Sequence, residues 1–492
     1  MEYIGIDLGT SAMKLLLLDE TGRILHTVQK DYPLEFPRPG WSQQDPALWE
    51  RAMLEGIPEL LRHCPEARIA GIGAAGQMHG LVLLDGENRV IRPAILWNDG
   101  RTQKQTDYLN ETVGKETLLE WTGNIAFAGF TAPKLLWVRE QEPENWARIR
   151  KVLLPKDYLN FLLTGQFTTD FSDASGTLLL DVRRRRWSGP MLALCGLRPE
   201  QLPELHESWD CVGTVRSDLA RQLGLPEGVR VAAGAGDNAA AAIGTGTVGH
   251  GACNLSLGTS GTLFVSMDRF RVVPGSGIHS FAHADGGYHL LGCMLSAASC
   301  NKWLMEDIFR STDFSSEQRA IAEDRLGRNP VFFLPYLMGE RSPINDAGAR
   351  AMFIGMSMDT RRQDLVQAML EGVAFGLRDS LEEARKMGIP ITRSGLCGGG
   401  AKSPLWRRIV CNVMNLPLDL TASEQGPGMG GAMLAMVTCG AYGTVEEVCR
   451  TLVRVAETIR PEPELARRYE ERYQKFRLLY PACRDLFLKL AI

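Results

Sequence analysis

Two stretches of the chain share one pattern, in which an apolar run leads into a Leu-Gly-Thr-Ser turn and a second apolar run leaves it. The first turn covers residues 8–11 and the second covers residues 257–260. Each pattern predicts a β-hairpin whose small turn residues expose backbone N–H groups and hydroxyls, which suit a phosphate. Because the copies lie about half a chain apart, we expect two related halves that close on one ligand.

Between these turns strand patterns alternate with helical ones, which predicts an α/β fold. An amphipathic helix is expected to start at Asp45 or Pro46, and a long one over residues 360–388. Residues 190–223 are also expected to be mainly helical. An apolar strand over residues 229–233 then precedes an alanine-rich helix that Asp237 opens.

Length, net charge and cysteine content limit the domain organisation and the kinds of binding partner that we expect. A length of 492 residues suggests two or more domains, and we expect them at residues 1–245 and 246–492. A formal net charge of −4 gives no reason to expect nucleic acid or an anionic membrane as a partner. Eleven cysteines without CxxC spacing argue against disulfides and zinc. No leader pattern and no apolar run of membrane-spanning length is visible, so a cytoplasmic location is expected. A homodimer is left open.

Three glycine-rich matches are rejected as nucleotide motifs of the familiar kinds. The GxGxxG match at residues 71–76 is followed by a strand instead of a helix, and the match at 244–249 follows a helix instead of a strand. Near residue 400 the lysine of a P-loop is one position out of register. The turn Gly399-Gly400-Ala401, with Ser403 as helix cap, can still hold a nucleotide flat against the backbone. A tight structural turn is the alternative. A glycine-rich stretch, 426–440, is expected to begin a helix that packs behind this turn.

Two aspartates sit where phosphoryl-transfer chemistry would need them. Asp7 ends the first strand two residues before Gly9, and can hold Mg²⁺, usually through water, or simply cap the turn. Asp237 follows a glycine-flanked strand end, where it can be a helix N-cap, a general base for an acceptor hydroxyl, or both.

The loop Gln77-Met78-His79-Gly80 lies between two expected strands. Polar side chains flanked by glycines are typical of a sugar pocket, although a single histidine is more often structural.

With these pieces placed, the chain resembles the FGGY family of carbohydrate kinases over nearly its whole length. Two segments carry the resemblance to the family signatures: residues 129–141, GFTAPKLLWVREQ, and residues 351–371, which include Phe353, Gly355 and Glu371. The resemblance implies a two-domain fold of the actin/ribonuclease H-like ATPase type with a central cleft. It also implies an ATP-dependent enzyme that phosphorylates a small-molecule sugar with Mg²⁺.

The resemblance further implies roles for individual residues. Asp237 would be the base, with Met78, His79 and Asn238 lining the sugar pocket. Asp7 would be the second catalytic carboxylate and would hold Mg²⁺ through water. The other implied site residues would contact ATP. Thr10, Ser11, Gly258 and Thr259 would surround the transferring phosphoryl group, and Gly399, Gly400 and Ala401 would contact the adenosine end. Several relatives have Asn where this chain has Pro404, so no adenine contact is carried over to that position.

Within the family the stretches GQMHG, AILWNDGR and FLPYLMGERSP are most similar to the bacterial xylulokinase branch. This similarity implies that D-xylulose is converted to D-xylulose 5-phosphate in pentose catabolism. Ribulose, gluconate and glycerol stay open as alternative acceptors, since the fold and the base do not discriminate among them. A non-catalytic sugar or ATP sensor is the alternative from another class.

Overall fold

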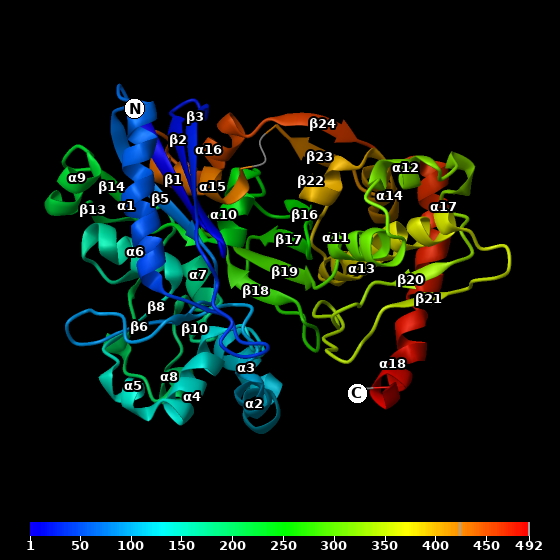
Figure 1. Ribbon diagram of the computed structural model, residues 1–492, viewed down its shortest axis with the longest axis horizontal. Helices are drawn as coiled ribbons and strands as arrows, with labels where there is room; N and C mark the ends of the chain where they lie inside the picture. Colours follow the sequence, from blue (N-terminus) through cyan, green and yellow to red (C-terminus); the bar gives the residue numbers. More distant parts are fainter. Residues whose placement is uncertain (423–424, 491–492) are drawn as a thin grey trace.

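A computed structural model describes residues 1–422 and 425–490. Two seven-stranded sheets form its framework, one in each half of the chain (Figure 1). The first contains, in spatial order with β15 beside β5, the strands β13 (Cys211–Thr214), β14 (Arg230–Ala232), β5 (Ile69–Gly76), β1 (Glu2–Leu8), β2 (Ala12–Asp19), β3 (Ile24–Asp31) and β15 (Ala235–Gly236). The second contains, also in spatial order, β18 (His279–Ala282), β19 (Tyr288–Met294), β17 (Gly261–Met267), β16 (Cys253–Leu257), β22 (Ser394–Cys397), β23 (Leu418–Thr421) and β24 (Val455–Ile459).

The two sheets repeat one topology. In the first, β3, β2 and β1 are antiparallel neighbours, and β5 and β14 continue in parallel with β1. In the second, β19, β17 and β16 are antiparallel, and β22 and β23 continue in parallel with β16. The Leu-Gly-Thr-Ser turns occupy the same place in both, between the first and second strands of the motif. The predicted hairpins and the relation between the halves are therefore confirmed, as is the predicted two-domain α/β fold class.

The other strands form short pairs: β4 (Gln43–Gln44) with β7 (Ala94–Ile95), β6 (Val82–Leu84) with β8 (Lys151–Leu153), β9 (Thr168–Asp170) with β12 (Glu204–His206), β10 (Leu180–Asp181) with β11 (Arg186–Trp187), and β20 (Phe332–Leu334) with β21 (Met352–Ile354). The α-helices before residue 250 are α1 (Pro46–His63), α2 (Gln103–Asp107), α3 (Lys115–Thr122), α4 (Thr131–Gln141), α5 (Pro143–Arg148), α6 (Pro155–Thr164), α7 (Phe171–Ser175), α8 (Gly189–Cys195), α9 (Ser217–Leu223) and α10 (Asp237–Gly244). Those after it are α11 (Ala298–Lys302), α12 (Phe314–Arg319), α13 (Arg362–Lys386), α14 (Pro404–Met414), α15 (Gly426–Thr438), α16 (Val445–Leu452), α17 (Pro463–Phe476) and α18 (Leu479–Leu490).

Helices cover both faces of the first sheet. Helix α1 begins at Pro46, as predicted, with Asp45 as its N-cap, and buries Trp49 and Ile57 in the core on one face. On the other face lie α10 and the glycine-rich helix α15 (Figure 1). Because a side chain on Gly5 would collide with the Gly428 carbonyl, strand and helix meet backbone to backbone.

The position of α15 corrects one prediction. This helix belongs to the second half of the chain by sequence, yet it does not pack behind the turn near residue 400. It packs on the sheet that carries Asp7 and against the helix that carries Asp237. Its glycines are needed there because a side chain on Gly430 would collide with the Ala240 carbonyl of α10.

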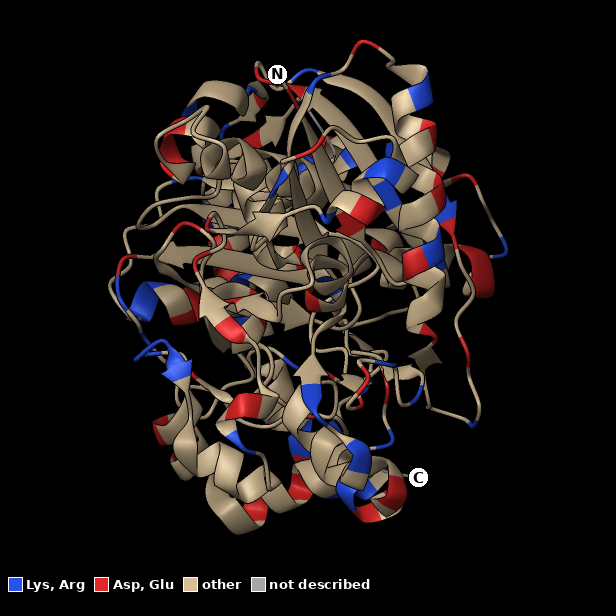
Figure 2. Ribbon diagram, turned by 90° about the vertical axis from the view of Figure 1, so that its left-hand side faces the viewer, with Lys and Arg blue, Asp and Glu red and all other residues tan. Residues whose placement is uncertain are grey.

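The expectation of a mainly helical segment over residues 190–223 is also wrong. Between α8 and α9 the chain forms β12 and β13, which pair with β9 and β14. Strand β13 extends the edge of the first sheet, a long-range pairing that local periodicity does not reveal. In the described part of the chain, no helix combines the length and apolar character needed to cross a membrane. Acidic and basic residues are interspersed along the ribbon in the view of Figure 2.

Candidate active site

The first phosphate-type turn is held rigidly by three neighbours. The Tyr32 hydroxyl donates to the Gly9 carbonyl at 2.7 Å, and the Trp97 indole donates to the Thr10 hydroxyl at 3.0 Å. The Gln44 amide donates to the Thr10 carbonyl at 3.2 Å. Ser11 is exposed at the tip. The turn is therefore fixed while its outer edge stays accessible.

The second turn is joined to the start of α11. The Ala298 N–H donates to the Gly258 carbonyl at 2.9 Å, and the Ser299 hydroxyl donates to the Thr259 carbonyl at 2.9 Å. In both of these hydrogen bonds a backbone carbonyl of the turn is the acceptor. The Thr259 side chain is exposed and lines a large cavity.

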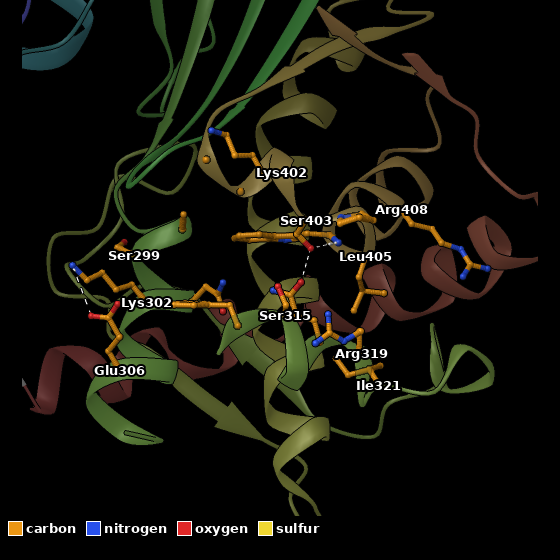
Figure 3. A pocket seen from close by; sticks show the side chains of 18 of the residues that line it. Ser299, Lys302, Glu306, Ser315, Arg319, Ile321, Lys402, Ser403, Leu405 and Arg408 are labelled. Atoms are coloured by element: carbon orange, nitrogen blue, oxygen red, sulfur yellow. Dashed lines mark hydrogen bonds and ion pairs between the residues drawn. The ribbon is translucent and has the colours of Figure 1, made fainter. Parts of the chain in front are cut away.

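That cavity has a volume of about 1080 Å³ and lies in the second half of the chain (Figure 3). Thr259, Gly399, Gly400 and Pro404 line it, whereas Ala401 is buried and is not among the lining residues. A side chain on Gly399 would meet open space, so this part of the turn is an unobstructed shelf. The cavity is large enough for a nucleotide.

The opposite wall comes from residues that carry no motif. Ser299 and Lys302 lie on α11, and the segment from Phe314 to Leu326 completes the wall. The Ser403 hydroxyl, which caps α14 as predicted, also donates to the Gln318 side chain and so ties this wall to the glycine turn (Figure 3). Sequence reasoning missed this wall because its residues follow no nucleotide-binding spacing.

Asp7 and Asp237 come from strand ends that flank β5, because β1 and β15 both pair with that strand. Asp7 is near the end of β1, opposite Lys14 in the neighbouring strand, and burial raises its pKa to about 6 although Lys14 opposes the rise. Asp237 is the first residue of α10, and the N-cap position belongs to Gly236, so the N-cap interpretation is wrong. Burial, with the charge of Asp7, raises the Asp237 pKa to about 7.

Two of the predicted side chains, Asn238 and Met78, lie beside that carboxylate. The Asn238 amide donates to Asp237 Oδ1 at 3.0 Å and reaches the Met78 sulfur at 3.8 Å. Met78 also packs so closely on Gly236 that a Cβ there would lie 2.9 Å from its Cγ. Next to it, His79 takes a left-handed backbone conformation with φ of 69°.

The His79 ring has a defined protonation state. Burial, with the nearby cations Lys134 and Arg341, lowers its pKa to about 3, so the ring is neutral at physiological pH. Its Nδ1 lies 2.7 Å from the Gly176 carbonyl oxygen, which can only accept. Nδ1 therefore carries the proton, and Nε2 is the acceptor that can meet a substrate hydroxyl.

The second half contacts the loop that contains His79, because the Phe281 ring of β18 lies 6.3 Å from the His79 ring, measured between centroids. The Asp237 charge contributes to a raised pKa of the Cys293 thiol, mainly a result of burial, and Cys293 pairs with Thr262 beside the second turn. The carboxylates and the sugar-type loop thus lie on one side, and the second turn and the cavity on the other.

Family models match both halves of the chain. The N-terminal domain of the FGGY family of carbohydrate kinases matches residues 2–244, and the C-terminal domain matches residues 253–439. The chain belongs to the FGGY family of carbohydrate kinases.

Individual relatives of this FGGY kinase match over nearly full length. It is 40% identical to a xylulose kinase of Escherichia coli over 483 residues, covering 97% of this chain and 98% of the relative. The crystal structure of a xyloylose kinase from Brucella ovis superposes with a TM-score of 0.95 at 43% identity, covering 99% of this chain and 100% of that one. A gluconate kinase from Lactobacillus acidophilus superposes with a TM-score of 0.94 at 26% identity, covering 99% of both chains.

Proposed function

We propose that this FGGY kinase transfers the γ-phosphoryl group of ATP to the terminal primary hydroxyl of D-xylulose, giving D-xylulose 5-phosphate. The observation that carries the proposal is the Asp237 carboxylate, whose pKa is raised to about 7 beside the Met78 and His79 loop. Full-length similarity to the xylulose kinase of Escherichia coli supports the choice of sugar.

In this proposal the Asp237 carboxylate accepts the proton of the attacking hydroxyl. A base whose pKa lies near the working pH combines a large ionised fraction with good proton affinity. The Asn238 amide holds Oδ1, which leaves Oδ2 to orient the hydroxyl oxygen for in-line attack. His79 Nε2 accepts from another sugar hydroxyl, and Met78 forms an apolar side of the pocket.

The nucleotide would lie between the two halves. Its adenosine end fits the cavity beside Gly399 and Gly400, and its phosphates extend past Thr259 toward Thr10 and Ser11. We propose no contact for Ala401, which is not in the cavity wall. Lys302 and Arg319, which also line the cavity, add positive charge for the polyphosphate.

Asp7 fits a magnesium ion held through water. The described residues contain no group of three or more acidic, His or Cys side chains that could hold a metal by themselves. Mg²⁺ typically uses only one or two carboxylates together with phosphates and water, and Asp7 is a partly exposed carboxylate beside the first turn. Bound there, the ion would neutralise charge on the phosphates.

We also propose that residues 1–245 and 246–492 are the two domains, with α15 staying packed on the first sheet, and that the two halves close on the substrates. The limits of the family models, at residues 244 and 253, support this division. Closure would exclude water, which would otherwise compete with the sugar for the phosphoryl group.

A coupled assay of ADP release over a panel of acceptors tests the proposal. D-xylulose is expected to give the highest kcat/KM, above ribulose, gluconate and glycerol. The similarity to a gluconate kinase makes gluconate the most informative competitor. Turnover of gluconate or glycerol without turnover of D-xylulose would refute the assignment of the sugar.

A further inference from the structure

A buried group of charged residues lies behind the strand end that leads to Asp237. Lys156, on α6, is fully buried, and its Nζ lies 2.8 Å from Asp157 and 3.1 Å from Asp170. The same ammonium donates to the Ala233 carbonyl at 3.1 Å. Burying a charge is costly unless it is paired and hydrogen-bonded, so these groups hold one another in fixed positions.

Ser172 connects this group to the segment before the proposed base. The serine is fully buried at the start of α7, and its hydroxyl donates to Asp170 Oδ2, the oxygen that also accepts from the Ser208 hydroxyl at 2.9 Å. The Ser172 oxygen in turn accepts from the Gly236 N–H at 3.2 Å. Gly236 directly precedes Asp237, so the chain of contacts ends one residue from the carboxylate.

The C-terminal end of helix α7 contacts the loop of residues 77–80, which contains Met78 and His79. Gly176, the C-cap of α7, provides the carbonyl to which His79 Nδ1 donates at 2.7 Å. A Cβ on Gly176 would collide with the His79 ring, so the ring lies against the Gly176 backbone as closely as only a glycine allows. The five-residue helix α7 therefore contacts Gly236, the residue before the proposed base, near its start and His79 at its C-terminal end.

We propose that Ser172 is a positioning residue for the reaction: through its bond to Gly236 it fixes Asp237 relative to His79, so that the acceptor hydroxyl is held in line for attack. This rests on the proposed role of Asp237 as the base. The buried ion pair of Lys156 and Asp170 supplies the rigidity, because Asp170 cannot shift without separating two buried charges. Small displacements of a reacting group reduce rates steeply, so the contact controls turnover more than binding.

Ser172→Ala in the full-length enzyme tests the proposal, with Ser208→Ala as the matched control. Both changes remove one hydroxyl donor from Asp170, but only the first removes the acceptor of the Gly236 N–H. Ser172→Ala is expected to lower kcat by about tenfold to a hundredfold with little change in KM for ATP. Ser208→Ala is expected to keep kcat within about twofold of wild type. Should Ser172→Ala not fold, Ser172→Cys, which replaces the hydroxyl by a weakly bonding thiol, gives the same comparison.

A double variant separates positioning from general loss of structure. In an Asp237→Asn background, Ser172→Ala is expected to cause no further loss of kcat, since its effect acts through Asp237. Equal losses in Ser172→Ala and Ser208→Ala, an unchanged kcat in Ser172→Ala, or an additive loss in the double variant would each overturn the proposal. The measurements use whichever acceptor the wild-type enzyme phosphorylates fastest, so an error about the sugar does not affect them.

Discussion

Replacing Asp237 by Asn should strongly reduce turnover, leaving a low residual rate, and yet stabilise the protein at alkaline pH. Asparagine keeps the oxygen that accepts from Asn238 but cannot take a proton. General base catalysis typically contributes a factor of about 10² to 10⁴, so kcat should fall at least about a hundredfold. Binding of ATP, measured by calorimetry, should stay within about threefold of wild type.

The stability gain follows from the raised pKa. A rise from 3.8 to about 7 means that the folded state disfavours the ionised carboxylate by up to about 4 kcal/mol at 1.36 kcal/mol for each pKa unit. The side chain keeps some contact with water, so we take about half of this value, roughly 2 kcal/mol, as the expected gain at pH 8.

The pH dependence gives the sign of the effect. Because the folded-state pKa lies above the unfolded one, wild-type stability falls as pH rises from about 4 to about 7, and Asn removes this loss. Urea unfolding should therefore show a gain of roughly 2 kcal/mol at pH 8 that shrinks to below about 1 kcal/mol at pH 5. A variant that is less stable than wild type at pH 8, equally stabilised at both pH values, or nearly as active as wild type would refute the reasoning.

Three further predictions concern neighbouring features. Wild-type kcat should fall with decreasing pH through about 7 as Asp237 becomes protonated, and a profile that is flat from pH 5 to 8 would contradict the base assignment. Gly176→Ala, which forces the His79 ring to move, should raise KM for the sugar about tenfold or more while leaving KM for ATP unchanged; initial-rate kinetics with each substrate varied would show whether ATP is affected instead. Gly400→Ala, whose Cβ would lie 2.8 Å from the Trp406 ring, should lower the free energy of unfolding by roughly 1–3 kcal/mol. Gly399→Ala places its Cβ in open space, so it should leave the thermal midpoint unchanged and alter only KM for ATP. Equal thermal midpoints for the two variants would contradict this prediction.

Local patterns were sufficient for the parts of the site that lie on turns and strand ends. Both hairpins and the Ser403 cap could be predicted because turn residues and caps act within a few positions of one another. The proximity of Asp237 to Met78 was reachable only through the family resemblance, because the two residues are separated by 159 positions and meet through Gly236.

Other features depend on packing between distant segments, which periodicity cannot encode. The glycines of α15 suggested a helix entry, but the choice of the first sheet as its partner depends on matching glycines at Gly5 and Gly73. The buried pair of Lys156 and Asp170 likewise looked like ordinary polar residues in the sequence, since the ion pair forms only when α6 and β9 come together.

Identification of the reaction product tests the central claim most directly. Purified protein would be incubated with ATP, Mg²⁺ and D-xylulose, and the phosphorylated sugar analysed by phosphorus and proton NMR. We predict stoichiometric formation of ADP and a monophosphate ester whose phosphorus couples to the protons of C5. Release of inorganic phosphate alone, or an ester at any other carbon, would contradict it.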